Sequence, residues 1–321
     1  MRLERPTARA RTRMAYAADR FLSTMRHCIC MLAANTLNDA GVPSSDGRVH
    51  GATALRIGAH GGASDKNDQV GFALSEGARK GTRLHRGLRE LILVEPHPDS
   101  YAALSRQLSS QRAPGSDMRA VADNSAACGT DRPGNVTFYS IEVANSTSRQ
   151  DDTVGGVGAG AQFSSMSWKH VYDSLGPRKG HLIQSGRVKI VTLPVPCYSI
   201  ETLLARHGAR PRDVRILTVD AEGYDVEILD GGKWGVGHLL PRLLVFEWFH
   251  VGHTPAARAL VERLAANHSY ACVPTPPRSH GLAAGRSQDM WCIHRSVAHV
   301  EACDTVWMRH DGVNCGRHCG W

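Results

Sequence analysis

Short apolar runs alternate with helix-length segments from residue 54 to about residue 295. Most of these runs are continuous, and many end in a turn or an acidic residue, which is typical of parallel strands covered on both faces. The pattern predicts seven strands, at residues 54–57, 91–94, 118–121, 216–219, 243–246, 270–273 and 290–293. Strands in alternation with helices predict an α/β fold with one doubly wound, mostly parallel seven-stranded sheet and helices on both faces.

Three segments between the predicted strands carry helix start or stop signals. The segment 100–108 follows a possible cap at Asp99 or Ser100, 199–207 stops before Gly208, and 254–267 has Pro255 at its first position. The last two predicted strands could pair antiparallel, as is common at the edge of such sheets.

One stretch, residues 124–190, interrupts this pattern with many Gly, Ser and Asn residues. It contains a predicted hairpin at 136–140, and long loops of this kind in a compact domain are usually functional or disordered. We therefore expect an insertion at 144–187 near the site. The predicted division is a basic N-terminal extension at 1–50, a catalytic domain at 51–298 and a Cys/His-containing tail at 299–321.

Composition argues against a nucleic-acid-binding protein and against a membrane-spanning one. The chain has 321 residues, 42% of them hydrophobic, and a formal charge of +8. Only 6 of its 38 basic residues are Lys, and the Arg residues are spread out without interleaved aromatics, so we expect no specific nucleic-acid partner. No apolar run reaches the roughly 18 to 20 residues that a membrane helix needs, and we expect no transmembrane segment.

Charge and cysteine content bear on the compartment. The N-terminal extension has the composition of a transit peptide or a disordered basic arm, which favours a cytoplasmic or organellar protein. Nine irregularly spaced Cys predict no disulfide framework and a reducing compartment. The tail lacks a Cys-x-x-Cys pair, so we assign no metal site to its potential zinc ligands, which are Cys303, His310, Cys315, His318 and Cys319.

Two segments have the character of a cofactor site. Glycines in Arg56-Ile-Gly-Ala-His-Gly-Gly-Ala63 directly follow the first predicted strand, where they allow close approach of a ligand to the backbone. Glu95 ends the second strand, where a carboxylate can accept hydrogen bonds from two ribose hydroxyls. Glycine clusters also mark ordinary turns, and Glu95 could instead cap the turn before Ser100.

A third segment, Ile216-Leu-Thr-Val-Asp-Ala-Glu-Gly-Tyr-Asp225, places Asp220 at the end of the fourth strand and Glu222 two residues later. Carboxyl ends of parallel strands line the ligand crevice. The two carboxylates could position or deprotonate a hydroxyl nucleophile, or hold a divalent cation. They could also simply cap the helix that begins near Gly223.

The fourth segment is Leu243-Leu-Val-Phe-Glu-Trp-Phe-His250, another strand that ends in a carboxylate. Trp248 and Phe249 are by default core residues. His250 has a pKa suited to proton transfer, although a single histidine at a strand end is often structural.

These segments, in this order, resemble the FkbM family of S-adenosylmethionine-dependent methyltransferases over roughly residues 54–295. The matching sequences are Ile57-Gly-Ala-His-Gly-Gly62, Val94-Glu-Pro-His-Pro98, Val195-Pro-Cys-Tyr-Ser-Ile-Glu-Thr-Leu-Leu204, Leu217-Thr-Val-Asp-Ala-Glu-Gly-Tyr-Asp225 and Phe246-Glu247. The resemblance implies a Rossmann-like class I fold, S-adenosyl-L-methionine as methyl donor, and O-methylation of a hydroxyl on a sugar, polyketide or related metabolite.

The resemblance also implies roles for single residues. Gly58 and Gly62 would approach the methionine part of the donor, Glu95 would bind its ribose, and Asp220 with Glu222 would lie at the reacting end. Further candidate residues are His60 and Asp123 for the cofactor and His250 for catalysis. Arg56 and His60 depart from the residues common in the family, which leaves open a non-catalytic cofactor-binding or interaction module.

Overall fold

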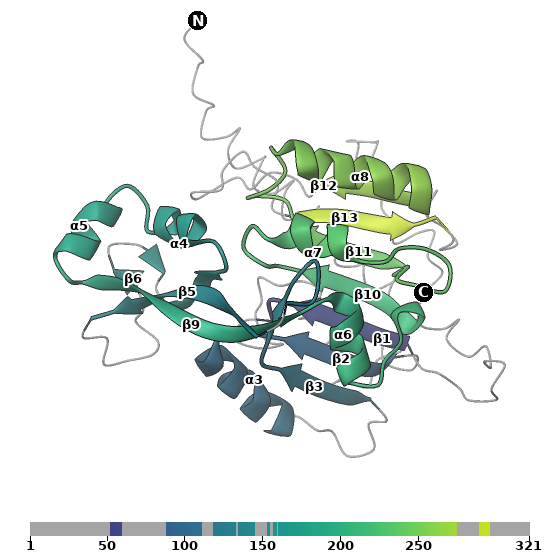
Figure 1. The fold of residues 1–321 in the computed structure, drawn as a ribbon, viewed down its shortest axis with the longest axis horizontal. Coiled ribbons are helices and arrows are strands. Elements are labelled where there is room, and N and C mark those ends of the chain that lie inside the picture. Colours follow the sequence, from purple (N-terminus) through teal and green to yellow (C-terminus); the bar gives the residue numbers. More distant parts are fainter. Residues whose placement is uncertain are drawn as a thin grey trace, which may run out of the picture.

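Seven strands form the central sheet of the computed structural model, in the order β12-β13-β11-β10-β1-β2-β3 (Figure 1). The strands are β1 (Ala52–Ile57), β2 (Leu88–Val94), β3 (Arg119–Asp123), β10 (Val214–Val219), β11 (Leu243–Glu247), β12 (Tyr270–Pro274) and β13 (Asp289–His294). Each of the seven predicted strands is present. The structure describes residues 52–59, 88–110, 118–132, 134–144, 153–154, 157–158, 160–274 and 289–295.

The central sheet is mixed. β1 runs parallel to β2 and β10, and the next neighbours outward, β3 and β11, continue the parallel arrangement. β13 is antiparallel to both β11 and β12. The α/β class is therefore confirmed, with the antiparallel pairing at one edge of the sheet that the sequence analysis allowed.

Successive residues of the strands supply two hydrophobic cores, one on each face of the sheet. Leu55 and Leu217 point to the core that contains α6 (Ile200–Arg206), α7 (Asp225–Gly231) and α8 (Pro255–His268). Ala54 and Ile216 point to the opposite core, which contains Leu104 of α3 (Pro98–Ser110). The strands are continuously apolar because both faces of the sheet are covered, as the sequence predicted.

The cap predicted at Asp99 or Ser100 is wrong, because α3 begins at Pro98 and contains both residues in its first turn. Two other helices do have side-chain caps. The Ser199 side chain accepts a hydrogen bond from the Thr202 N–H at the start of α6, and Thr254 caps α8 through the Ala257 N–H. These hydroxyls satisfy backbone donors that have no partner within the helix. The cap of α6 fixes the direction in which the chain turns from β9 into the helix.

A second sheet, in the order β4-β9-β5-β8, lies to one side of the first (Figure 1). It contains β4 (Ala126–Ala127), β5 (Asn135–Val143), β8 (Gly160–Ser165) and β9 (Val188–Tyr198), and it is accompanied by α4 (Trp168–Ser174), α5 (Lys179–Gln184) and the short pair β6 (Thr153–Val154) and β7 (Val157–Gly158). β9 was not predicted, because Pro194 and Pro196 obscure its strand pattern. The hairpin predicted at 136–140 is wrong, because these residues lie within the single strand β5.

Two disulfides, Cys128–Cys197 and Cys272–Cys292, contradict the prediction that the cysteines form no disulfides. Cys272 and Cys292 are direct partners in the register of β12 and β13. Cys197 belongs to β9, which pairs with β4 immediately before Cys128. The prediction was wrong because strand pairing brings these cysteines together, and irregular spacing along the chain carries no sign of it.

Some predictions fall outside the described residues. The N-terminal extension, the tail with its potential zinc ligands, and the candidate cofactor residues His60 and Gly62 all lie there. The division into 1–50, 51–298 and 299–321 stays a prediction. Within the described part of the chain, no helix is long and apolar enough to cross a membrane.

Candidate functional site

The order of the central sheet reverses between β1 and β10, and in such folds ligands bind at the carboxyl ends of the strands beside that point. Gly58 follows β1 there with a φ of 76°. A Cβ atom on Gly58 would lie 1.8 Å from the carbonyl oxygen of Asp220. Glycine is therefore required so that the ends of the two strands can meet, and the atom that approaches it belongs to the protein.

A pocket opens at this edge. The two sheets line it together, with residues after β1, β2 and β10 from the central sheet and residues of β4, β5 and β8 from the second sheet. Its lining residues are Ile57, Gly58, Glu95, Pro96, Ala126, Ala127, Phe138, Ser164, Met166, Asp220, Ala221 and Glu222. The fold thus brings four predicted site residues, Gly58, Glu95, Asp220 and Glu222, to one cavity.

Asp220 stands among other carboxyl groups. Burial raises the pKa of Asp220 well above its usual value, and the charges of Glu222 and Asp225 raise it further. The side chain is nevertheless exposed to the pocket, so water there offsets part of the burial penalty. Asp220 therefore faces the pocket as a carboxyl group that holds its proton more firmly than an ordinary surface aspartate.

The buried side chain of Asp225 stabilises the conformation of this segment. Its carboxylate accepts hydrogen bonds from the backbone N–H groups of Ala221 and Glu247, at 3.3 and 3.1 Å. Burial outweighs these bonds and raises the pKa of Asp225 to about 7. One side chain therefore joins the turn after β10 to the end of β11.

The side chains of Asp220 and Glu222 do not cap α7. The helix begins at Asp225 after Tyr224 and has no side-chain capping hydrogen bond. Glu222 instead adopts a φ of 49°, a left-handed conformation that is uncommon for a residue with a side chain. The structure therefore disfavours helix capping as the explanation for these two carboxylates.

The second sheet holds the Glu222 turn in place. The Ser165 hydroxyl, at the end of β8, donates a 3.0 Å hydrogen bond to the Glu222 carbonyl. The next residue, Gly223, has a φ of 94°, and a Cβ atom on it would lie 3.6 Å from Nδ1 of His170. The predicted insertion therefore reaches the turn through both a hydrogen bond and a histidine that lies over a glycine.

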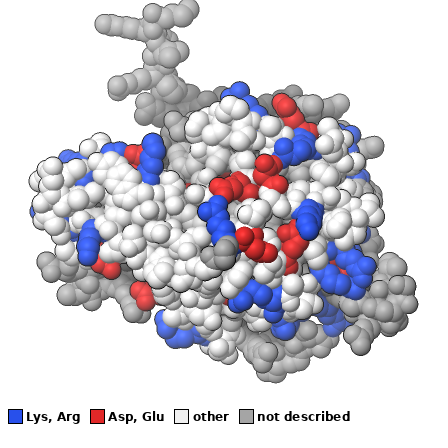
Figure 2. Space-filling model, in the orientation of Figure 1, with Lys and Arg blue, Asp and Glu red and all other residues white. Residues whose placement is uncertain are grey.

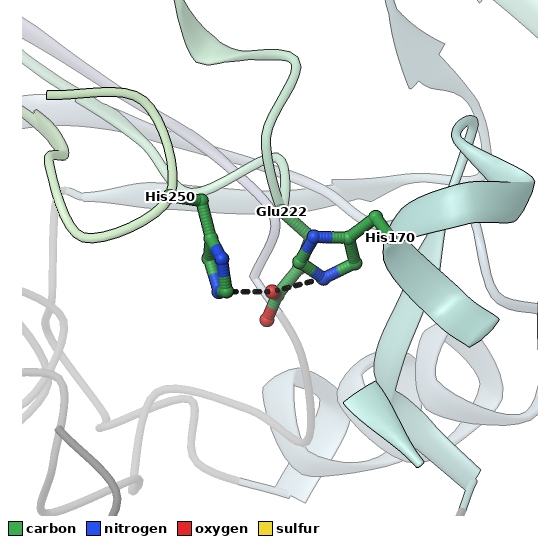
Figure 3. A group of neighbouring side chains, drawn as sticks. All are labelled: His170, Glu222 and His250. Carbon is green, nitrogen blue, oxygen red and sulfur yellow. Dashed lines mark ion pairs between the residues drawn. The ribbon is translucent and has the colours of Figure 1, made fainter. Parts of the chain in front are cut away.

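Three side chains from distant parts of the chain meet at this turn (Figure 3). Nε2 of His170, on α4, lies 2.9 Å from Oε2 of Glu222, and Nε2 of His250, after β11, lies 3.7 Å from the same oxygen. The two imidazole rings meet edge to face with their centroids 4.4 Å apart. Sequence reasoning found Glu222 and His250 but missed His170, because no motif surrounds it and its place depends on how the second sheet folds.

Glu247 extends this cluster towards the core. Its Oε1 lies 3.3 Å from Nε2 of His250, and its Oε2 is buried with no hydrogen-bond partner in the described part of the protein. Burial raises the pKa of Glu247 well above its usual value, and Glu222 and Asp220 raise it further. Several acidic side chains therefore gather around the two histidines, and each makes it harder for its neighbours to ionise.

The position of Glu95 is compatible with both of the roles that the sequence left open. Its Oε1 accepts a 2.8 Å hydrogen bond from the His97 N–H, so the carboxylate stabilises the turn into α3. The same residue lines the pocket. Cofactor binding by Glu95 remains a prediction that its position permits.

Asp123 differs from the other candidates, because it is not among the pocket-lining residues. Its carboxylate accepts a 2.6 Å hydrogen bond from the Ser125 hydroxyl and lies 2.7 Å from His207 and 3.2 Å from Arg206. Burial alone would raise the pKa of Asp123, but these partners lower it overall. The side chain is thus engaged with α6, and its predicted role in cofactor binding has no contact in its favour.

The surface charge gives no sign of a nucleic-acid groove on the face in Figure 2. Lys and Arg are scattered there among Asp and Glu, and the described residues of that face form no continuous basic band. A nucleic-acid groove needs clustered positive charge to track the phosphates.

Fold and site together define an α/β protein with a ligand pocket at the topological switch point of its sheet. A family model described as the methyltransferase FkbM domain matches residues 60–270, which is more than half of the chain. The chain belongs to this family and is a methyltransferase. No curated protein and no solved structure matches it.

Proposed function

We propose that the protein transfers a methyl group from S-adenosylmethionine to a hydroxyl of a small-molecule or glycan acceptor, such as a sugar, a polyketide or a related metabolite. The observation that carries this proposal is the position of the family's Asp220-Ala-Glu-Gly segment, beside the pocket at the switch point. S-adenosylmethionine supplies an electrophilic methyl group on its sulfonium.

The described pocket residues fit such a donor in two respects. Glu95 is buried and has one oxygen bound to the turn at His97, which orients its carboxylate. A fixed carboxylate at the end of the second parallel strand is suited to bind ribose hydroxyls. The apolar side chains of Ile57, Phe138 and Met166 on the pocket wall suit the less polar parts of a nucleoside.

Proton removal is the chemical step that falls to the protein. A hydroxyl that gains a methyl group at oxygen must lose its proton, and a base whose pKa lies closer to the working pH takes up that proton more effectively. Asp220 is exposed to the pocket and has a raised pKa. We assign it the role of base, and we assign Glu222 and His250 the role of holding the acceptor oxygen.

Donor binding can be tested separately from turnover. Calorimetry with S-adenosylhomocysteine should detect binding by the full chain, and Glu95→Gln should weaken it about 10- to 100-fold, because a charge-assisted hydrogen bond is lost. Glu142→Gln, an exposed position on β5, is the matched control and should leave binding unchanged. Equal affinities for all three proteins would remove Glu95 from the donor site.

Turnover is then measured with a tritiated methyl donor against a panel of hydroxylated sugars and polyketides. We expect transfer to at least one hydroxylated acceptor. Binding of the donor without transfer to any acceptor would instead support a non-catalytic cofactor-binding module. Absence of donor binding would contradict the proposal altogether.

A further inference from the structure

We propose that His170, Glu222 and His250 form a binding site for a divalent transition-metal ion of the zinc class. Two imidazoles and one carboxylate are a ligand set that such ions accept while positions remain open for water or substrate. One potential ligand atom from each of the three residues lies within 4.8 Å of the others.

The distances suit one shared ion. A metal ion about 2.1 Å from each ligand in a tetrahedral site separates the ligand atoms by about 3.4 Å. Nε2 of His170 and Nε2 of His250 lie 2.9 and 3.7 Å from Oε2 of Glu222, on either side of that value. Small side-chain movements would therefore bring both nitrogens to that distance from the Glu222 oxygen.

His170 has a buried ring nitrogen that a metal ion could bind. Its side chain is only 9% exposed, and Nε2 is buried without a hydrogen bond of acceptable geometry in the described part of the chain. The nitrogen is nevertheless 2.9 Å from Glu222, close enough for attraction but not directed as a hydrogen bond. A buried polar atom without a partner is costly, and an ion between the two groups would satisfy both.

The surroundings favour a cation and hold the ligands rigidly. Two further acidic side chains stand beside the site, because Asp220 comes two residues before Glu222 and Oε1 of Glu247 lies 3.3 Å from Nε2 of His250. Glu222 is held in its left-handed conformation by the Ser165 hydrogen bond. Residues in such conformations concentrate at functional sites, where the surrounding structure stabilises the strain.

An ion bound to Glu222 would lie beside the pocket, because Glu222 is one of its lining residues. A coordinated hydroxyl oxygen would lie there within the same cavity as Asp220. The ion would thus supply the acceptor-holding role assigned above to Glu222 and His250. That role rests on the proposed function, whereas binding of the ion does not.

The test is a titration of the chelator-treated full chain with Zn²⁺ or Co²⁺, without donor or acceptor. We expect one ion whose affinity falls at least about 100-fold in His250→Ala and in Glu222→Gln. The absorption spectrum of bound Co²⁺ should show nitrogen and oxygen ligation. His253→Ala, an exposed neighbour of His250, should leave affinity and spectrum unchanged.

His170→Ala is the third ligand variant, and circular dichroism checks that α4 still folds. If it does not, the His250 and Glu222 variants decide the result alone. Zn²⁺ affinity that is the same in these variants and the parent would overturn the site, as would the absence of any bound ion. If Zn²⁺ bound at the Cys- and His-containing tail instead, its affinity would be the same in the variants and the parent, and the proposed site would be overturned. Failure of methyl transfer with an intact ion site would instead refute the proposed function.

Discussion

Two aspartates at the carboxyl edge of the same sheet have opposite surroundings. Asp123 ends β3 and is enclosed by hydrogen-bond donors and positive side chains, which lower its pKa. Asp220 follows β10, opens into the pocket and is crowded by other carboxyl groups, which add to the rise in its pKa. A position at a strand end therefore does not by itself make an aspartate part of the candidate site. The aspartate must also face the pocket, as Asp220 does and Asp123 does not.

The largest effect is expected from Gly58→Ala, which disrupts the close contact between Gly58 and the backbone of Asp220. Its methyl group would overlap the Asp220 carbonyl and require a positive φ, so we expect a loss of about 3 to 5 kcal/mol in the free energy of unfolding. Denaturant unfolding measures it. Gly176→Ala is the matched control, because Gly176 has a φ of 73° and open space around it. Its cost should be only about 1 kcal/mol, and equal costs would mean that the strand ends do not need this contact.

The next effect concerns activity. Asp220→Asn should lower the rate of methyl transfer about 100-fold, equivalent to about 2.7 kcal/mol in the barrier, because the amide cannot take up a proton. Its free energy of unfolding should not fall, since one charge is removed from a crowded group. Asp230→Asn, an exposed position on α7 that pairs with Arg263, should keep the parent rate. Retained turnover in Asp220→Asn would remove Asp220 from the mechanism.

Asp123→Asn should instead lower stability, by about 2 kcal/mol at pH 7, because Arg206 and His207 lose a buried partner. The folded-state pKa of Asp123 lies below the ordinary value of 3.8, so its charged form stabilises the folded state. That contribution is present above pH 3.8 and is lost as the pH falls through the lower folded value. Unfolding curves of parent and variant should therefore converge in acid. A constant difference across pH would show that the charge of Asp123 is irrelevant.

The smallest effect is expected from Ser165→Ala, which separates the second sheet from the Glu222 turn. Loss of the hydrogen bond to the Glu222 carbonyl, and of the one that the Ser165 hydroxyl accepts from the Ser167 N–H, should cost about 1.5 kcal/mol of unfolding free energy and lower Zn²⁺ affinity several-fold. Ser109→Ala on α3 removes a comparable hydroxyl-to-carbonyl bond at an exposed position and should change neither by a measurable amount. If both variants bind Zn²⁺ like the parent, the turn holds Glu222 without help from Ser165.

Much of the central sheet follows from local pattern. The seven strands and the helices α3, α6 and α8 were predicted within a few residues, because apolar runs and caps act over short distances. β9 escaped because two prolines interrupt it, and the pairing of Cys272 with Cys292 escaped because it depends on register.

The residues of the candidate site likewise fall into those that the sequence could predict and one that it could not. Gly58, Glu95, Asp220 and Glu222 follow strand ends, so parallel pairing alone brings them to one edge. His170 could not be predicted, because it comes from a helix beside the second sheet and reaches Glu222 only when both sheets are in place.

The α/β class, the order of the strands along the chain and the methyltransferase family could all be predicted from the amino-acid sequence, because they depend on local apolar pattern and short motifs. Which of the strand-end acids face the pocket depends on contacts between distant parts of the chain. Asp123 meets His207 across 84 positions of the chain, and Glu222 meets Ser165 across 57. Contacts at such separations depend on how the sheets assemble, and they determine whether a strand-end carboxylate is neutralised or left facing the pocket.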